Sequence, residues 1–287
     1  MTVLVTGSRG KVGSTLIALL HGAGADVRAA SAAPEKLRPP AGVDTVHCAL
    51  DDPATFPAAL DSVTSVFLYA EPSQTGAFLD EARAAGVEHI VLLSSSSALD
   101  PDAADNPIAA SHLAVEQAVA ASAIETSVLQ PGAFAGNAFQ WRWALESAGA
   151  IDLPYPGSYS DPIHERDIAE AAFALLARPE PRGRTYHLTG PESLTFTEQL
   201  AILERAVGGP FPFNAVTREA WKASMAGYMP SAFADGLLDY WASTDGSPTP
   251  LTHAVEELTG HPARTFAQWA TENADAFRTA WPPRAAR

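Results

Sequence analysis

Cysteine is almost absent from the sequence, which contains only Cys48. A single thiol cannot form an intrachain disulfide, and it cannot supply the thiolates of a structural zinc site. Positive charge is scarce as well, because 18 Lys and Arg residues face 33 Asp and Glu residues, for a formal net charge of −15. That charge repels nucleic acid and anionic membranes, so we expect neither as a partner.

Long hydrophobic runs are also missing. No apolar stretch reaches the roughly 20 residues that a membrane span needs, and a strand-like run begins at residue 2, which leaves no room for a secretory leader. We therefore predict a cytoplasmic protein. The eight histidines include no close pair with metal-ligand spacing, so we expect no metal. A Gly-x-Ser-x-Gly elbow and a Walker lysine are absent, which argues against a serine hydrolase and against phosphoryl transfer.

The first half of the chain alternates short apolar runs with helical patterns, which is typical of a parallel sheet covered on both faces. The expected strands are Val3–Thr6, Asp26–Ala30, Thr45–Cys48, Ser65–Tyr69, His89–Ser94, Thr126–Gln130 and Thr185–Leu188. The expected helices are Val12–His21, Ala54–Leu60, Gly76–Ala85, Ser111–Ala121, Glu165–Leu176 and one capped at Thr195 that ends near Val207. This order predicts an α/β, doubly wound Rossmann fold, which binds ligands at the carboxyl ends of its strands.

Prolines and tryptophans interrupt this alternation after Gln130. We expect two domains. Residues 1–131 and 161–190 form the dinucleotide-binding domain, and residues 132–160 and 191–287 form a smaller, mostly helical substrate-binding lobe.

A glycine-rich segment follows directly on the first strand and opens an amphipathic helix. Glycine there lets backbone N–H groups approach a pyrophosphate, which the positive end of the helix dipole also attracts. The spacing Gly-x-x-Gly-x-x-Gly is one residue longer than the common dinucleotide fingerprint, and the alternative is a surface turn. We predict that the segment binds a dinucleotide through Gly7, Ser8, Arg9, Gly10, Lys11, Val12 and Gly13.

The end of the second strand bears on the choice of cofactor. An NAD-dependent enzyme usually has an acid there, which binds the ribose hydroxyls, whereas this chain has Ser31-Ala32-Ala33. Arg9, with Arg28 or Lys36 nearby, could instead meet a 2′-phosphate. We therefore expect NADPH, with NADH as the alternative. Arg28 could equally be a solvated strand residue.

Other cofactor contacts are expected where strands end. Asp51 is placed to accept a hydrogen bond from the adenine amino group, or else it caps the helix that begins at Pro53. The predicted cofactor site also includes Ser31, Tyr69, Ala70 and Ser94.

Stretches along the whole chain form a further pattern: Thr6–Gly13, Leu50-Asp51-Asp52-Pro53, Ala85–Ser95, His112-x-x-x-Glu116, Pro131-Gly132-x-Phe134-x-x-Asn137, Arg166-Asp167-Ile168-Ala169, Leu188–Glu192 and Leu258–Phe266. Together they resemble the NmrA-like group of atypical short-chain dehydrogenases. The resemblance implies an NAD(P)-binding Rossmann fold. It leaves the reaction open, because the group includes quinone reductases, reductases of imines or enones, and redox-sensing regulators that bind the cofactor without turnover.

Two positions depart from that group. Ala32 stands where the group usually has an Arg after the second strand, which weakens the assignment of NADP. Gln130 stands where the group usually has an Arg before Pro131, which is expected to alter the packing beneath the nicotinamide.

Lysine is rare as well, and no Tyr-x-x-x-Lys motif occurs. In typical short-chain dehydrogenases that Lys lowers the pKa of the Tyr, which exchanges a proton with the substrate. Alcohol oxidation by this route is disfavoured, whereas a quinone or an activated imine needs only a hydride and a weak proton donor. The candidate catalytic donors are His112, Ser96, Tyr155 and Tyr159. The alternatives are a surface pair of His112 with Glu116, and serines that only satisfy the backbone at a strand end.

A substrate pocket is expected after the sixth strand, although aromatic residues there are more often core. Its predicted members are Phe134, Asn137 and Trp141. We predict an NAD(P)H-dependent reductase of a small, planar, electron-poor substrate such as a quinone, enone or imine, with a homodimer left open. The alternative is a non-catalytic NAD(P)-sensing regulator. An epimerase or dehydratase of sugar nucleotides is the weakest candidate, since those reactions also use the missing Tyr and Lys.

Overall fold

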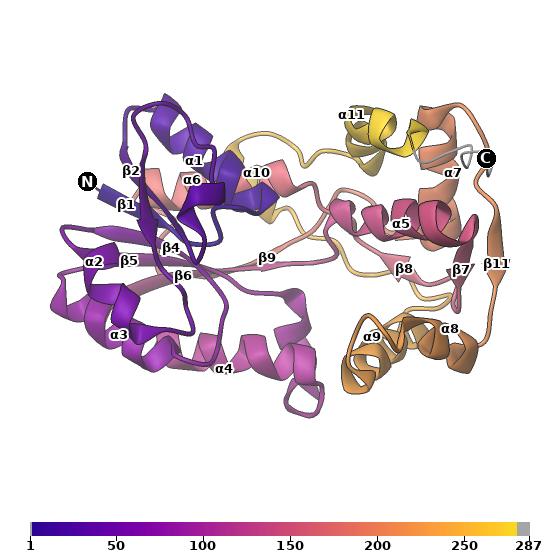
Figure 1. The fold of residues 1–287 in the computed structure, drawn as a ribbon, viewed down its shortest axis with the longest axis horizontal. Coiled ribbons are helices and arrows are strands. Elements are labelled where there is room, and N and C mark those ends of the chain that lie inside the picture. Colours follow the sequence, from indigo (N-terminus) through magenta and orange to yellow (C-terminus); the bar gives the residue numbers. More distant parts are fainter. Residues whose placement is uncertain (1, 280–287) are drawn as a thin grey trace. The chain divides into compact units, whose positions relative to one another are not determined.

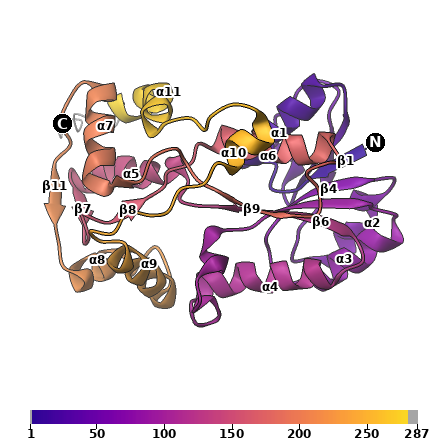
Figure 2. The same cartoon turned by 180° about the vertical axis from the view of Figure 1, so that it is seen from behind.

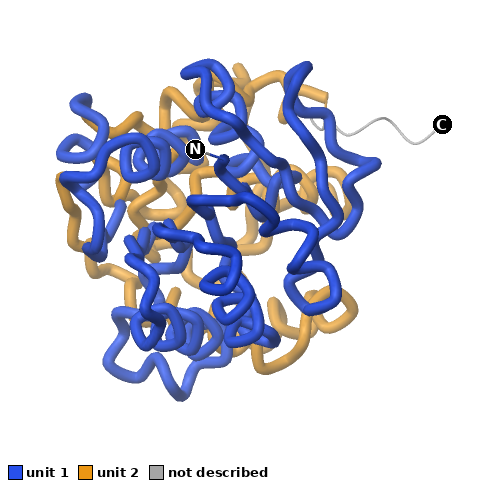
Figure 3. The backbone as a smooth tube through the Cα atoms, turned by 90° about the vertical axis from the view of Figure 1, so that its left-hand side faces the viewer, with its two compact units in different colours: residues 1–131, 165–188, 254–261 blue, residues 132–164, 189–253, 262–287 orange. Residues whose placement is uncertain are grey.

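The computed structural model describes residues 2–279, in two compact units (Figure 3). Unit 1 contains residues 1–131, 165–188 and 254–261. Unit 2 contains residues 132–164, 189–253 and 262–287. No helix among the described residues is long and apolar enough to cross a membrane.

Unit 1 is built on a parallel sheet of seven strands in the order β3-β2-β1-β4-β5-β6-β9 (Figure 1). The strands are β1 (Thr2–Val5), β2 (Asp26–Ser31), β3 (Asp44–His47), β4 (Ser65–Tyr69), β5 (His89–Leu93), β6 (Glu125–Pro131) and β9 (Thr185–Leu188). The order reverses between β1 and β4, which is the point where a doubly wound sheet opens a crevice for a ligand. The predicted fold class is confirmed.

Helices cover both faces of this sheet, as the apolar strands require (Figures 1 and 2). One face carries α1 (Lys11–Gly22), α6 (Glu165–Ala177) and α10 (Ala254–Thr259), and the other carries α2 (Phe56–Leu60), α3 (Thr75–Ala84) and α4 (Pro107–Ala121). Alternate strand residues such as Leu4, Val66 and Ile90 pack against α2, α3 and α4 in one buried cluster. Burial on both sides fixes the strand register, and so fixes which residues end each strand.

Unit 2 is mostly helical. Its elements are α5 (Phe139–Ala148), β7 (Ile151–Leu153), β8 (Tyr159–Ser160), β10 (Leu194–Thr195), α7 (Phe196–Val207), β11 (Phe213–Ala215), α8 (Arg218–Met225), α9 (Ser231–Ser243) and α11 (Phe266–Arg278). Aromatic rings form its core, where Trp221 packs edge-on against Trp241, and Phe139 against Trp269. Helix α7 starts with the expected capping box, in which Thr195 and Glu198 exchange hydrogen bonds.

Several boundaries differ from those expected. Residues 161–164 and 189–190, which we expected in the dinucleotide-binding domain, lie in unit 2. Helix α4 begins at Pro107 rather than Ser111, because the Asn106 side chain accepts hydrogen bonds from two backbone N–H groups of the first turn. The expected helix Ala54–Leu60 is a 3₁₀ turn, Pro53–Thr55, followed by α2. Residues 254–261, which we expected in the lobe, belong to unit 1, where α10 packs on α6 and β9.

Candidate functional site

The glycine segment forms a tight turn between β1 and the N-terminus of α1. Gly7 has φ of 62°, a left-handed conformation that favours glycine, and its carbonyl oxygen accepts a hydrogen bond from the N–H of Gly10 at 2.9 Å. Gly10 is the N-cap residue of α1, and no side chain caps this end of the helix. The first N–H groups of α1 are therefore available to an anionic ligand, with the positive end of the helix dipole behind them.

Gly13 holds the turn against the helix. A Cβ atom at this position would lie 2.5 Å from the Gly7 carbonyl oxygen and 3.0 Å from its carbon, so only glycine fits. Gly13 lies in the first turn of α1, and the close approach that it permits is to the loop backbone. The third glycine thereby keeps the turn and the helix N-terminus together.

Buried hydrogen bonds anchor the turn to the sheet. The Ser8 hydroxyl donates to the Val5 carbonyl oxygen at 2.7 Å, so this side chain braces the turn. The Thr6 hydroxyl donates to Phe67 in β4 and accepts from the N–H of Tyr69. Tyr69 itself is 51% exposed at the end of β4, and its Cβ lies closest to the position that a Gly7 side chain would take. Val12 is buried, and Lys11 is exposed on the first turn of α1.

A pocket of about 250 Å³ lies beside the turn and the second strand. Three cationic residues line it, namely Arg9, Lys36 and Arg38, together with Ser8 and Ser14. Arg38 is a residue that the sequence interpretation missed. It lies beyond the 3₁₀ turn Pro34–Lys36, and its guanidinium donates to the Glu35 and Leu37 carbonyl oxygens. The pocket concentrates positive charge at the end of β2 in an otherwise acidic chain.

Arg28 does not line this pocket. Its Nη1 donates to the carbonyl oxygens of Ala59 and Asp61, at 3.0 and 2.7 Å, on the other side of β2. The Ser31 hydroxyl, at the end of β2, accepts a hydrogen bond from the N–H of Ala33. Arg28 is thus a structural link between β2 and the α2 region.

The helix cap that was an alternative role for Asp51 belongs to the next residue. Asp52 caps the 3₁₀ turn, because its side chain accepts from the N–H of Ala54 at 3.1 Å. The alternative in which Asp51 is the cap is therefore wrong. Asp51 is exposed just beyond β3, so its carboxylate is available to a ligand.

A buried hydrogen-bond network lies at the ends of β5 and β6. The Ser94 hydroxyl donates to Glu116 Oε1 at 2.5 Å, and Gln130 Nε2 donates to both carboxylate oxygens of Glu116 at 2.9 Å. Glu116 comes from α4, so the network joins three elements of unit 1. The carboxylate is satisfied by neutral donors where a cation would be usual. Ser94 is 4% exposed, so its hydrogen bond to Glu116 is a buried contact between the end of β5 and α4.

His112 lies one helical turn before Glu116. Burial lowers the pKa of His112, and the nearby Glu116 charge only partly offsets that effect. Its Nδ1 atom is buried without a hydrogen-bond partner. A neutral imidazole is a poor acid at neutral pH, so His112 is better suited to a hydrogen bond than to proton transfer. Ser96 opens the 3₁₀ turn Ser96–Leu99 after β5, and Ala70 follows β4 directly.

The remaining predicted residues belong to unit 2. Trp141 is 4% exposed and packs edge-on against Phe196 in the core of unit 2. Phe134 is half-buried and Asn137 is exposed, in the stretch that follows β6. Tyr155 and Tyr159 are half-buried, and the Arg218 guanidinium lies near the Tyr155 phenol.

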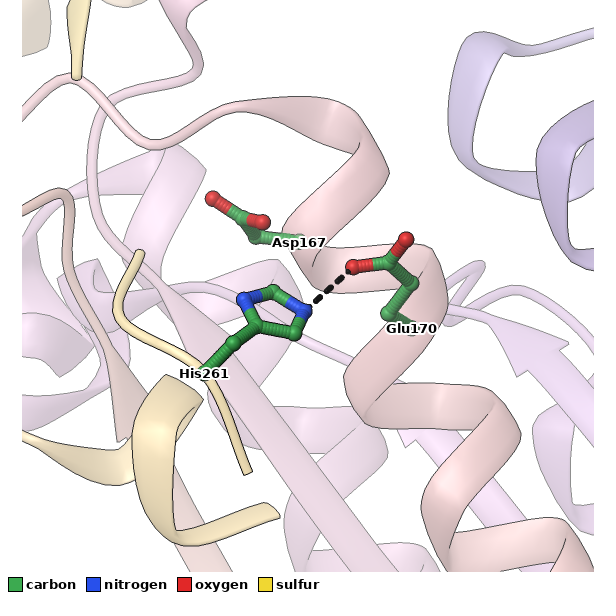
Figure 4. Close-up of side chains that lie close together, drawn as sticks. All are labelled: Asp167, Glu170 and His261. Atoms are coloured by element: carbon green, nitrogen blue, oxygen red, sulfur yellow. Dashed lines mark hydrogen bonds and ion pairs between the residues drawn. The ribbon is translucent and has the colours of Figure 1, made fainter. Parts of the chain in front are cut away.

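Two carboxylates and one imidazole form a cluster between α6 and the segment that follows α10. Asp167 and Glu170 of α6 and His261, which follows α10, offer ligand atoms within 4.8 Å of one another (Figure 4). His261 Nε2 and Glu170 Oε2 are 2.8 Å apart, and Arg166 donates to the other Glu170 oxygen. The contact of His261 with Glu170 ties residues 254–261 to α6.

Residues 1–242 match the sequence model of the NmrA-like family. The chain belongs to the NmrA-like family. It is 35% identical over 283 residues to the (4-alkanoyl-5-oxo-2,5-dihydrofuran-3-yl)methyl phosphate reductase of Streptomyces griseus, with 96% of this chain and 99% of the relative covered. It is 32% identical over 289 residues to the NAD(P)H azoreductase of Xenophilus azovorans, with 97% of this chain and 100% of the relative covered.

A solved structure shares the fold of this chain. The NADPH-dependent quinone oxidoreductase of Escherichia coli, in complex with NADPH, matches with a TM-score of 0.78 over 94% of this chain and 99% of that one. The identity is 22%, so this likeness concerns the fold. The resemblance to the NmrA-like family that the motifs indicated is confirmed.

Proposed function

We propose that the protein is an NADPH-dependent reductase of a small, planar, electron-poor organic substrate, in particular one with an activated double bond. The observation that carries the proposal is the glycine turn with its free helix N-terminus beside the cationic pocket. A pyrophosphate fits the helix N-terminus, and a 2′-phosphate fits the pocket of Arg9, Lys36 and Arg38. When bound, the reduced nicotinamide supplies a hydride.

The relatives support the substrate class. The compound in the name of the Streptomyces relative has a ring double bond conjugated with both an alkanoyl and a ring carbonyl group. The Xenophilus relative is named for azo compounds, which contain an N=N double bond. The furanone compound and the azo compounds are both flat hydride acceptors, and each becomes an anion when a hydride is added. The absence of Tyr-x-x-x-Lys suits such acceptors, since they need less acid–base help than an alcohol or ketone.

Turnover tests this proposal directly. We expect the protein to oxidise NADPH in the presence of doubly activated enones or quinones. The loss of the reduced-nicotinamide absorbance measures this reaction. A panel of enones, quinones, azo compounds and imines gives the preferred class. Tight binding of NADPH with no turnover of any acceptor would contradict the proposal and favour a cofactor-sensing protein.

The cationic pocket predicts the choice between the two cofactors. We expect Arg9→Ala, Lys36→Ala and Arg38→Ala each to weaken NADPH binding about tenfold or more, and NADH binding much less, because a charged hydrogen bond contributes about 1.5–3 kcal/mol. Fluorescence titration with both cofactors measures the ratio of the two dissociation constants. Arg83→Ala, an exposed residue on α3, is the matched control. Equal affinity of the wild type for NADPH and NADH would contradict the assignment.

A further inference from the structure

Positive charge is distributed unevenly along the sheet of unit 1. Arg9, Lys36 and Arg38 line the pocket beside the end of β2. From there to residue 141 the only Lys or Arg in the sequence is Arg83, at the end of α3 that leads into the start of β5. The segment that forms β5, α4 and β6 therefore contains no Lys or Arg.

A carboxylate lies at the carboxyl ends of β5 and β6 without a cation beside it. Glu116 of α4 accepts hydrogen bonds from Ser94, the residue after β5, and from Gln130, near the end of β6. Both donors are neutral side chains. His112 does not compensate the charge, because burial lowers its pKa and leaves the imidazole neutral at neutral pH. The network therefore carries one net negative charge.

The cationic pocket indicates which half of the sheet faces which half of the cofactor. A dinucleotide binds across the point where the strand order reverses, with one nucleotide on each side of it. The 2′-phosphate that fits the pocket belongs to the adenosine, so the adenosine half is expected over β1, β2 and β3 (Figure 1). The nicotinamide half is then expected over the ends of β4, β5 and β6, where the Glu116 network lies.

The charge of the nicotinamide ring differs between the two forms of the cofactor. The reduced ring is neutral, and loss of a hydride, which takes both electrons of a ring C–H bond to the acceptor, leaves the ring with a positive charge. A fixed negative charge nearby stabilises the cationic form and has little effect on the neutral one.

We infer that the Glu116 carboxylate favours the oxidised over the reduced cofactor, and so makes bound NADPH a stronger hydride donor. Glu116 forms no bond to the cofactor and moves no proton in this role, because it acts through its charge. Ser94 and Gln130 hold the carboxylate at the strand ends without cancelling that charge. The inference rests on the cofactor site of the proposed function and on no particular acceptor.

Glu116→Gln removes the charge and keeps the shape of the side chain. The new amide oxygen can accept from Ser94. The Gln130 oxygen, which has no hydrogen-bond partner among the described residues, can accept from the new amide N–H once the Gln130 amide turns over. The variant therefore keeps the network and tests the charge alone.

The measured quantity is the dissociation constant of NADP⁺ divided by that of NADPH, which isothermal titration calorimetry gives without any acceptor. We expect this ratio to rise about tenfold in Glu116→Gln, since a unit charge has an effect of that order over roughly 10 Å at an effective dielectric constant of about 20. For a two-electron couple, a tenfold rise makes the potential of the bound cofactor about 30 mV more positive.

Two variants serve as controls. Glu125→Gln removes the same charge from the exposed first residue of β6, at the opposite end of the strand and roughly 17 Å from Gln130 at about 3.3 Å per residue. The ratio should stay at its wild-type value there. Glu116→Asp keeps the charge, so it should change the ratio much less than Glu116→Gln does.

A further variant neutralises the charge and keeps Glu116. Gln130→Arg places a guanidinium where Gln130 Nε2 now donates to both carboxylate oxygens, and arginine suits such a pair of bonds. The ratio should rise as it does in Glu116→Gln.

The outcomes separate this inference from the proposed function. A ratio that is unchanged in Glu116→Gln refutes the role of Glu116, whether or not the wild type reduces an acceptor. An equal rise in Glu125→Gln also refutes it, because net charge would then explain the effect. If the wild type binds cofactor and shows the expected ratios but reduces no acceptor, the reductase function fails and the inference stands. Should Glu116→Gln not fold, an unchanged ratio in Gln130→Arg overturns the inference.

Discussion

Gly13→Ala is expected to weaken NADPH binding about a hundredfold and to lower the midpoint of thermal unfolding. The added Cβ meets the Gly7 carbonyl group and the Ser8 Cα, which are backbone atoms that cannot rotate away. Relief of this overlap costs about 1–3 kcal/mol, and it opens the turn that presents the helix N-terminus. Fluorescence titration measures the binding, and differential scanning calorimetry measures the unfolding midpoint.

Gly22→Ala is the matched control, since Gly22 is the last residue of the same helix and a Cβ there has nothing within 4 Å. This variant should bind NADPH like the wild type and unfold at an equal or higher temperature, because alanine favours the helix. Wild-type affinity in Gly13→Ala would refute the role given to the turn.

His89 is expected to make the protein sensitive to acid. It is fully buried in β5, where its Nε2 lies 3.0 Å from the Ser127 hydroxyl, which also accepts from the N–H of Gly183. Desolvation, with a contribution from the Arg182 charge, lowers the pKa of His89 to about 4. The unfolded chain binds this proton near pH 6.5 and the folded one only near pH 4, so stability is lost as the pH falls through this window. The loss amounts to about 3 kcal/mol, since one pKa unit corresponds to about 1.4 kcal/mol.

Urea unfolding at several pH values measures this effect. Asp161 titrates in the same window with the opposite sign, because its raised pKa favours the folded state as the pH falls. The comparison of wild type with His89→Gln isolates the histidine, and the variant should show a smaller loss of stability on acidification. His47→Gln, at an exposed position of β3, is the control. An equal loss in all three proteins would contradict the prediction.

Features with a local cause could be predicted from the sequence. The turn at Gly7–Gly13 could be predicted from its glycines and from its place between a strand and a helix. The helix that starts at Thr195 could be predicted from its capping box. The alternation of strands and helices likewise determined the fold of unit 1. The sequence did not decide between neighbouring residues that suit the same role. Asp51 and Asp52 both suit the cap of the same turn, and Asp52 is the cap.

Features with a tertiary cause could not be found in this way. Arg28 and Arg38 are both basic residues near the end of β2, and only the path of the chain beyond β2 decides which one lines the pocket. Trp141 and Phe134 both follow β6, and helical packing buries the first in the core. The burial of Asp161 gives no motif at all, because its carboxyl group packs against Gly132, which lies 29 residues earlier in the chain. The close contact between Gly132 and this carboxyl group is visible only in three dimensions.

The way the chain crosses between its units has a consequence for recombination. Unit 1 is assembled from three separate stretches, so the boundary between the units is crossed five times, after residues 131, 164, 188, 253 and 261. A chimera that takes its second unit from a relative must exchange three gene segments together and match the chain at all five junctions. Unit 2 is therefore easier to change by point substitution than by transfer of a module.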